Sequence, residues 1–363
     1  MGGVVDDKLI IWGGCQAQED GSFPYLHDSV YSYAPSKISG SGRLSKILSQ
    51  GLTNSRKMAI VGKLVGQRRG SSVEGKHPGK VHGDEMEGEW KVIPATGDIH
   101  RGRSAAASAV FNHSIYIFGG DSDDGFVNDL TTLSASGEFK QLYPTGDIPT
   151  PRRDLKAWTF DNNIYFFGGV VKDLVGLRKG DFVRNLQHLF SLTSDLYQYN
   201  PLTNVFKRLS TTGEGPSPRS GFAVAQLGHR VFIHGGDVNE DGPASFFILD
   251  LKTLNWTKME NSGIQSGSCL HTLTQVSSPQ FVLLGGDIEG KISNRVAMFD
   301  VDKSEWTEQE SLSSEYDGSE GGVMCHQAFT IRDDKELSVI CIGGYIDKES
   351  KRHPNHFVLF NFS

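Results

Sequence analysis

The sequence predicts an all-β protein built from one repeated unit, and three observations support this. A short apolar run that ends in two glycines occurs six times, as in "NIYFFGG" at 163–169. The second glycines lie at positions 14, 120, 169, 236, 286 and 344, so the unit spans about 50 residues. The 43 glycines among 363 residues fit many tight turns rather than long helices.

Each unit has room for four short strands. Between Asp195 and Gly236 the chain reads "DLYQYNP", "VFKRLSTTG", "PSPRSGFAVAQLG" and "RVFIHGG", separated by turn clusters such as "NPLTN" and "LGHR". Later units keep this order, because Trp256 follows Asp250 by six residues and Trp306 follows Asp300 by six. These spacings leave no room for a helix of ordinary length.

The order of double glycine, strand and Trp-bearing strand resembles the kelch repeat, whose four-stranded units form the blades of a β-propeller. Six double glycines imply a single six-bladed kelch propeller over residues 1–363. The resemblance implies a structural role for all twelve glycines, which end the second strand of each blade: Gly13, Gly14, Gly119, Gly120, Gly168, Gly169, Gly235, Gly236, Gly285, Gly286, Gly343 and Gly344. A phosphate-binding loop is not expected, since no helix and no G-K-[ST] follow.

One segment, Pro35–Asp84, does not fit the repeat. It holds ten Lys or Arg, two acidic residues and no Phe, Tyr or Trp, so it cannot build a core. Without these fifty residues Tyr33 would lie seven positions before Trp90, the spacing of Tyr199 and Phe206. We therefore expect a disordered basic insertion in a turn of blade 1, either a real loop or a retained intron. A solvated loop without function and a basic nucleic-acid or targeting patch remain open.

The two ends of the chain also depart from the repeat. The first unit begins at "GGVVDD" and the last ends at "HFVLFNFS" without a Trp-bearing strand. We therefore expect incomplete first and last blades, an open edge on blade 6, and a true start upstream of Met1.

Composition limits the function classes. The net charge of -7 argues against a nucleic-acid partner. No apolar run reaches the length of a membrane span and no secretion signal is present, so we expect a cytoplasmic or nuclear protein without membrane insertion. The four cysteines and twelve histidines show no metal-ligand spacing, and we expect free buried thiols, no metal and no cofactor.

Finer features resemble the family of kelch domain-containing protein 2. These are the long loop "VVKDLVGLRKGDFVRNLQHLFSLTSD" after Gly169, "HTLTQVSSPQFVLLGG" in blade 5, and "TGEGPSPRSG". Members of that family are substrate receptors of cullin-2 ubiquitin ligases that bind the extreme C-terminus of a target protein. The resemblance implies elongin and cullin-2 as partners, although the helices that bind them in those receptors are absent before Ser363. A Rab effector with kelch motifs is a weaker match.

The family's ligand-binding positions are altered in this chain. The receptors hold the target carboxylate with arginines on the loop after the blade 4 double glycine, where this chain has Asp237–Gly242, including Asp241 and no basic residue. Their Ser-Trp pair before the blade 5 histidine corresponds to Cys269 and Leu270, and only His271 is retained.

The loops after the double glycines are acidic. Asp121, Asp237 and Asp287 begin three such loops, and the propeller resemblance implies that these loops gather on one face around the channel. This face would disfavour a free carboxylate unless arginines point into the channel. The candidates are Arg103, Arg152, Arg153 and Arg219, in turns leading to innermost strands. The alternatives are that each aspartate caps its own turn, and that the arginines bond carbonyls between blades.

We also compare enzymes with binding proteins. Neither the Tyr and His ligands of a kelch-type copper oxidase nor the arginine triad of a sialidase is found in the sequence. The sequence therefore predicts a non-catalytic protein-interaction propeller, of the cullin-2 ligase substrate-recognition type, that binds peptide termini. The alternative is a scaffold or vesicle-trafficking propeller with no ligase link.

Overall fold

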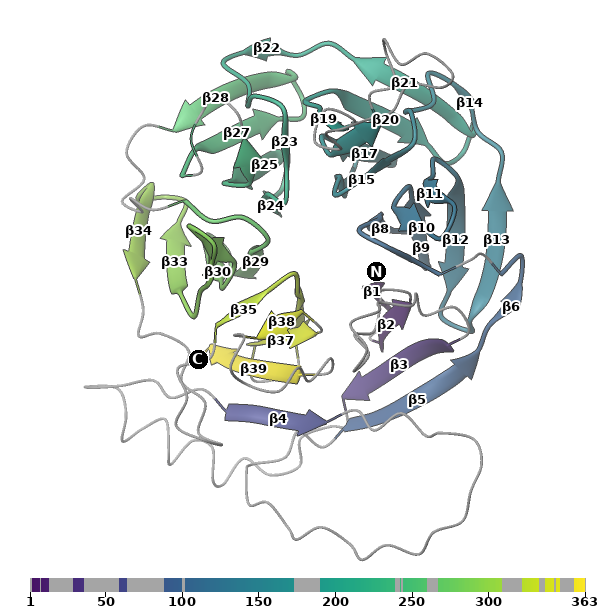
Figure 1. Cartoon of the computed structure of the whole chain (residues 1–363), viewed down its shortest axis with the longest axis horizontal. Coiled ribbons are helices and arrows are strands. Elements are labelled where there is room, and N and C mark those ends of the chain that lie inside the picture. The colour runs from purple at the N-terminus through teal and green to yellow at the C-terminus, as the bar shows by residue number, and fades with distance from the viewer. Residues whose placement is uncertain are drawn as a thin grey trace, which may run out of the picture.

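The computed structural model of the chain describes residues 2–6, 8–12, 29–35, 59–63, 88–99, 102–172, 190–238, 242, 244–259, 267–308, 322–332, 337–342, 344–346 and 356–362. In these residues the regular elements are strands, and six sheets of four or five strands stand around a ring (Figure 1). We call these sheets blades 1 to 6 in chain order. No helix in the described residues is long and apolar enough to span a membrane.

The first three blades follow one another around the ring. Blade 1 contains β1 (Gly2–Val5), β2 (Lys8–Trp12), β3 (Ser29–Pro35) and β5 (Gly88–Pro94). Blade 2 contains β8 (Ala107–Phe111), β9 (Ser114–Phe118), β12 (Leu130–Ser134), β13 (Glu138–Leu142) and β6 (Thr96–Gly97). Blade 3 contains β16 (Lys156–Phe160), β17 (Asn163–Phe167), β20 (Leu196–Asn200), β21 (Val205–Leu209) and β14 (Thr145–Gly146).

The remaining three blades complete the ring. Blade 4 contains β24 (Ala223–Leu227), β25 (Arg230–His234), β27 (Phe246–Asp250), β28 (Asn255–Met259) and β22 (Thr212–Gly213). Blade 5 contains β29 (Thr272–Ser277), β30 (Gln280–Leu284), β33 (Val296–Asp300) and β34 (Glu305–Glu308). Blade 6 contains β36 (Gln327–Arg332), β37 (Leu337–Ile342), β39 (His356–Phe362) and β4 (Ala59–Lys63).

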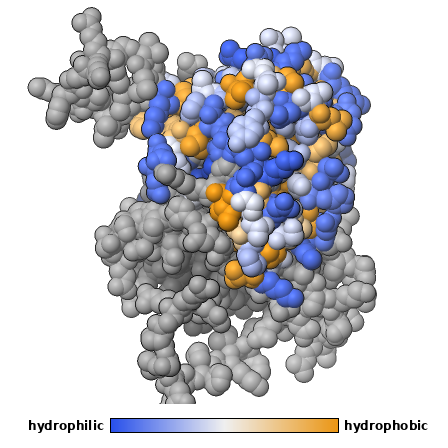
Figure 2. All heavy atoms as spheres, turned by 90° about the vertical axis from the view of Figure 1, so that its right-hand side faces the viewer, coloured by the Kyte–Doolittle hydropathy of each residue, from blue (hydrophilic) through white to orange (hydrophobic). Residues whose placement is uncertain are grey.

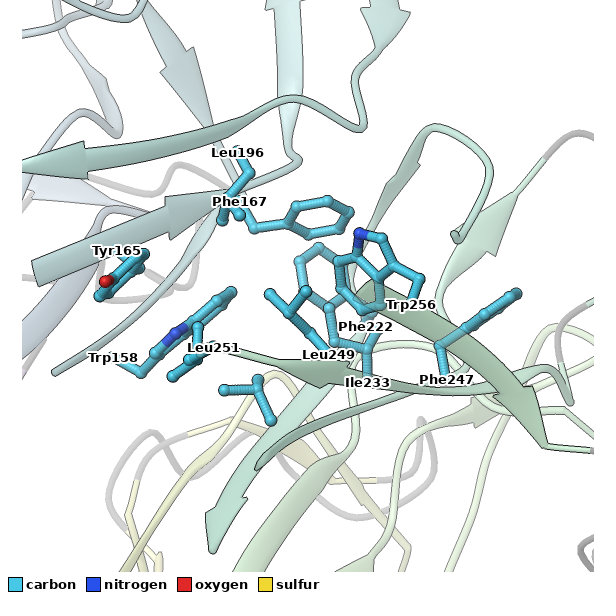
Figure 3. Close-up of a cluster of buried hydrophobic side chains, with 11 residues drawn as sticks. Trp158, Tyr165, Phe167, Leu196, Phe222, Ile233, Phe247, Leu249, Leu251 and Trp256 are labelled. Atoms are coloured by element: carbon cyan, nitrogen blue, oxygen red, sulfur yellow. The ribbon is translucent and has the colours of Figure 1, made fainter. Parts of the chain in front are cut away.

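The core lies between consecutive blades. The cluster in Figure 3 joins Trp158 and Phe167 of blade 3 to Phe222, Leu249 and Trp256 of blade 4. Equivalent clusters lie between blades 1 and 2, 2 and 3, 4 and 5, and 5 and 6. Period-two alternation places these side chains between the sheets, because each strand presents successive residues to opposite faces. On the outer side of the ring, Figure 2 shows hydrophilic side chains interspersed with hydrophobic ones.

Both terminal blades have four strands, which corrects the expectation that they are incomplete. In blade 1, β1 pairs with β2 along its whole length, so the first strand is present. In blade 6, β4 pairs antiparallel with β39, with Val358 opposite Ile60, so the expected open edge is covered. The strand that covers it comes from within Pro35–Asp84, the segment expected to be disordered.

The segment Pro35–Asp84 lies between two paired strands of blade 1. Tyr33 on β3 is opposite Trp90 on β5, as Tyr199 is opposite Phe206 in blade 3, and Pro35 is opposite Gly88. The segment therefore leaves and re-enters blade 1 at neighbouring positions. Apart from Pro35 and β4, its residues lie outside the described part of the chain, and for these the expectation of disorder stays a prediction.

Candidate functional site

A second tier of short strands forms one face of the ring, which we call the loop face. It contains the loops after the double glycines and the turns before the innermost strands. Its strands are β7 (Arg103–Ser104), β10 (Asp121–Ser122), β11 (Gly125–Phe126), β15 (Arg152–Arg153), β18 (Val170–Lys172), β19 (Phe190–Leu192), β23 (Arg219–Ser220), β26 (Asp237–Val238), β31 (Asp287–Ile288), β32 (Lys291–Ile292), β35 (Val323–Met324) and β38 (Tyr345–Ile346).

Three arginines at one repeat position belong to the framework. Nη1 of Arg103, Arg152 and Arg219 donates to the carbonyl oxygen of the first double-glycine residue of the same blade, at 3.1, 3.3 and 2.9 Å. All three side chains are buried. The structure therefore places Arg103 and Arg219 in the framework and not at a ligand, because a buried guanidinium committed to a backbone carbonyl is not presented to a ligand. The side-chain bonds lie within one blade, and not between blades as the structural alternative had it.

The acidic partners of these arginines strengthen the framework. Asp129 forms a two-point ion pair with Arg103, at 2.5 and 2.7 Å, and Asp195 pairs with Arg152 at 2.6 Å. Burial raises the pKa of Asp195, but the hydrogen bonds and charge of Arg152 outweigh it, so this pKa lies below its ordinary value. In blade 4, Ser245 takes the place of the aspartate beside Arg219.

The double glycines connect neighbouring blades. The amide of Gly236 donates to the carbonyl of Ser268 in blade 5 over 3.0 Å, and Gly120 and Gly169 make the same bond to the next blade. Gly236 has a φ of 104°, outside the range that residues with a side chain readily adopt. Gly119, Gly168, Gly235, Gly285, Gly286 and Gly344 also have positive φ, whereas Gly13, Gly14 and Gly343 lie outside the described residues.

Arg153, one position after a framework arginine, does reach the loop face. Its side chain is 39% exposed, and it contacts Asp121 through Nη1 at 3.2 Å and Asp154 through Nε at 3.4 Å. Its guanidinium also lies 5.2 Å from the centre of the Phe126 ring. Burial raises the pKa of Asp154, and the charges of Arg153 and Lys156 offset part of that rise. The predicted Arg153 and Asp121 are thus brought together by β7, β10 and β15.

Beside Arg153 the loops of blades 3 and 4 enclose a recess of about 520 Å³. Its lining residues, which define the blade 3–4 recess, are Arg153, Asp154, Val170, Phe190, Ser191, Leu192, Pro218, Ser220 and Asp237. Of the predicted site residues, Arg153 and Asp237 line it. Phe190, Ser220 and Asp154 were missed, although Ser220 occupies the same repeat position as Arg153 and could have been found from that alignment.

Cys269 and Asp287 lie farther around the ring, beyond the recess. Cys269 forms a β-bridge with Asp287. Burial raises the pKa of the Cys269 thiol to about 11, and the carboxylates of Asp287 and Asp237 add to this rise. The thiol is therefore protonated and weakly nucleophilic at neutral pH. Asp287 accepts a hydrogen bond from the amide of Gly290, which is the turn-capping alternative. Asp241 lies outside the described residues.

Leu270 belongs to a ring of residues at the channel mouth. Ala105, Asp154, Gly221, Leu270 and Cys325 occupy one repeat position, and all have φ between 54° and 61°. Their backbones are linked around the mouth, since the amide of Leu270 donates to Gly221 and that of Cys325 to Leu270. The conformation of Leu270 is therefore a framework property of its repeat position.

His271 is buried beneath this ring, which corrects its expected role in ligand contact. Its Nε2 lies 2.9 Å from Nδ1 of His234, and neither side chain is exposed. Burial, followed by the charge of His234, holds the pKa of His271 well below its ordinary value. Among the described residues, no three His, Cys, Asp or Glu side chains are grouped to hold a metal ion.

Lys156 is a further residue that the sequence did not single out. It begins the innermost strand of blade 3, and its charge acts on His271 and His326 of blades 5 and 6. Burial lowers the pKa of Lys156, against the opposing charges of Asp154 and Cys325. The charge of Lys156 therefore acts on ionisable groups of three blades.

Comparisons with known proteins agree with this architecture. The model of the KLHDC2/KLHL20/DRC7 Kelch-repeats domain matches residues 70–278. Kelch domain-containing protein 2 of Bos taurus is 26% identical over 289 residues, which cover 76% of this chain and 70% of that protein.

Two other relatives match shorter stretches. Tip elongation aberrant protein 1 of Schizosaccharomyces pombe is 31% identical over 150 residues, 39% of this chain and 13% of that protein. The N-(sulfonatooxy)prop-2-enimidothioate sulfolyase of Thlaspi arvense is 34% identical over 101 residues, 24% of this chain and 29% of that protein.

Proposed function

We propose, because this chain belongs to the KLHDC2/KLHL20/DRC7 Kelch-repeats domain family, that its loop face binds an extended segment of a partner protein without catalysing a reaction. The observation that carries this proposal is the blade 3–4 recess. It is concave, it combines apolar walls with a few polar groups, and it lies on loops held by a rigid ring. Such a recess suits side chains of a peptide.

The finer proposal is that the chain is the substrate-recognition subunit of a cullin-2 RING ubiquitin ligase. Its support is the resemblance to kelch domain-containing protein 2, which extends over 76% of the chain. In this role the loop face would hold the end of a target protein, while elongin and cullin-2 would bind elsewhere. A cytoplasmic or nuclear location follows from the same proposal.

The non-catalytic part of the proposal is supported by the chemistry of the loop face. The Cys269 thiol has a pKa raised to about 11, and His271 is buried against His234. Neither group is poised to act as a nucleophile or a general base near pH 7. The similarity to a sulfolyase covers 24% of the chain, and a similarity of fold does not by itself imply a shared activity.

A second candidate is a scaffold or vesicle-trafficking propeller with no ligase link. It is favoured by the buried positions of Arg103, Arg152 and Arg219, which are committed to the framework and therefore do not replace the carboxylate-binding arginines of the ligase receptors.

Affinity capture from cells distinguishes the two candidates. The full chain, tagged and expressed in human cells, is recovered and probed for elongin B, elongin C and cullin-2. Recovery of all three supports the ligase role. Recovery of other proteins without elongin or cullin-2 would leave the scaffold role in its place.

A further inference from the structure

We infer that the blade 3–4 recess binds a lysine or arginine side chain from the middle of an extended partner segment. The inference rests on the proposed function, and it names the chemistry that this recess selects.

The recess is formed by two short sheets that face each other. In blade 3, Arg153 is opposite Val170 and Val170 is opposite Leu192, so these three side chains share one face. In blade 4, Ser220 is opposite Asp237, so this pair also shares a face. The recess therefore has a wall from blade 3 that is apolar apart from Arg153, Asp154 and Ser191, and a polar wall from blade 4.

The apolar wall contains an exposed aromatic ring. Phe190 is 41% exposed, and its ring centre lies 5.5 Å from that of Phe126, which anchors it. Leu192 continues this wall, and Pro218, next to β23, adds an apolar residue from blade 4. Lys172 lies over the Phe126 ring at 5.2 Å, so its ammonium is associated with Phe126. A flat aromatic surface that is anchored but accessible suits the methylene stem of a long side chain, or the guanidinium plane of an arginine.

The polar wall lacks a partner of its own. Ser220 is only 8% exposed, yet in the described residues its hydroxyl makes no hydrogen bond, although it lines the recess. Asp237 beside it is exposed and forms no ion pair within the described residues. The Ser220 hydroxyl and the Asp237 carboxylate are therefore both available to a ligand in the recess.

The charges around this wall favour a cation. Arg153 is shared by Asp121 and Asp154, so it does not neutralise Asp237. The charge of Lys156 acts on Asp154. The carboxylates of Asp237 and Asp287 both act on Cys269, which places a second negative charge near Asp237. A basic side chain would gain a charge-assisted bond to Asp237 and a hydrogen bond to Ser220, whereas a carboxylate would meet repulsion.

The test uses arrays of heptapeptides with randomised sequences and Arg, Lys, citrulline, Gln, Glu or Leu at the central position. One array is acetylated and amidated at its ends, and two matched arrays leave either the N-terminus or the C-terminus free. We expect the full chain to bind Arg and Lys peptides at least tenfold more strongly than citrulline and Gln peptides. Asp237→Asn should abolish most of this preference, and Ser220→Ala should reduce it. Asp302→Asn, which changes a charge in the turn between β33 and β34, is the matched control.

Three outcomes are distinguishable. Peptide binding without a preference for Arg or Lys overturns this inference and leaves the proposed function standing. The same holds if the preference for Arg and Lys is as large in Asp237→Asn as in Asp302→Asn. Binding only when the peptide has a free N-terminus or a free C-terminus also overturns it, in favour of a terminus. Absence of binding to any peptide overturns the proposed function as well. Thermal melting of each variant shows that the fold is retained.

Discussion

Arg219 donates a hydrogen bond from Nη1 to the carbonyl oxygen of Gly235 over 2.9 Å. Through this contact a buried side chain holds the backbone of the double glycine in blade 4. The backbone carbonyl of Arg219 in turn accepts a hydrogen bond from the amide of Gly169 in blade 3, at 3.0 Å. One residue therefore joins two blades. The same pair of contacts is made by Arg152, so the arginine position is a repeated joint of the ring.

Replacing Arg219 should destabilise the fold. Arg219→Ala leaves the buried carbonyl of Gly235 without its donor and creates a cavity, so we expect a loss of about 2 to 4 kcal/mol in the free energy of unfolding. Urea denaturation followed by tryptophan fluorescence measures this. Arg208→Ala, which removes an exposed arginine of β21, is the control and should cost less than about 0.5 kcal/mol. Equal stabilities of the two variants would contradict a framework role.

Two glycines of blade 4 differ in their backbone conformation and in the space around them. A Cβ at Gly236 would lie 2.7 Å from the Ser220 carbonyl oxygen and 2.9 Å from Cβ of Phe222, whereas a Cβ at Gly228 would meet nothing within 4 Å. Gly228 has a φ of 60°, in the left-handed region, whereas Gly236 has a φ of 104°, beyond it. We expect Gly228→Ala to cost about 1 to 2 kcal/mol through left-handed strain alone. Gly236→Ala should cost about 1 to 3 kcal/mol more, through overpacking and its less favourable φ. Urea midpoints that coincide would exclude both additional contributions.

The repeated elements of this fold could be predicted from the sequence because each repeat imposes the same local requirement. Double glycines mark positions where a positive φ is needed, as at Gly168 and Gly169. Their number in the sequence therefore predicted the number of large sheets, which is six. The spacing argument for Tyr33 and Trp90 was also sufficient, because residues that face each other across a hairpin keep a fixed separation once an insertion is removed.

The site could be predicted only in part, because it depends on which of two adjacent residues faces the framework. Arg152 and Arg153 are identical in sequence terms, yet only Arg153 reaches the loop face. Phe190 and Asp237 both line the recess, but they come from loops of different blades. The distance between two such loops cannot be read from the sequence. The strand β4 was missed because its pairing with β39 is long-range and its segment lacks aromatic residues.

Stability should fall in mild acid because of buried histidines. Burial, then the charge of Lys156, lowers the pKa of His326 to about 3, and burial, then the charges of Arg295 and Arg219, lowers that of His234 to about 3. The unfolded chain takes up these protons near pH 6.5, so each histidine contributes stability that is complete above about pH 6.5 and is lost as pH falls towards 3. At pH 5 the loss should be of order 2 kcal/mol per histidine.

Urea denaturation at pH 7 and pH 5 checks this dependence. His326→Gln, which cannot be protonated, should show a smaller drop between the two pH values than the unchanged chain. A drop that is the same in both proteins would mean that other groups, such as carboxylates, cause the acid sensitivity.

Removing the inserted segment should weaken the closure of the ring between blades 6 and 1. Pro35 and Gly88 are opposite each other at the end of β3 and β5, so residues 36–87 can be replaced by an Asn-Gly turn without moving either strand. The deletion removes β4 and leaves β39 as an unpaired edge. We expect a loss of roughly 2 kcal/mol, from a few backbone hydrogen bonds of about 1 kcal/mol each, and concentration-dependent self-association through the free edge.

A matched variant separates the strand from the loop that carries it. Here 59–63 is kept and residues 36–58 and 64–87 are replaced by Gly/Ser linkers of equal length, so the loop-closure entropy stays nearly constant. This variant should retain the stability and the monomeric elution volume of the unchanged chain. If the deletion is as stable as the unchanged chain, or if the Gly/Ser variant is as unstable as the deletion, the pairing of β4 with β39 does not close the ring. Urea denaturation together with size-exclusion chromatography at two concentrations distinguishes these results.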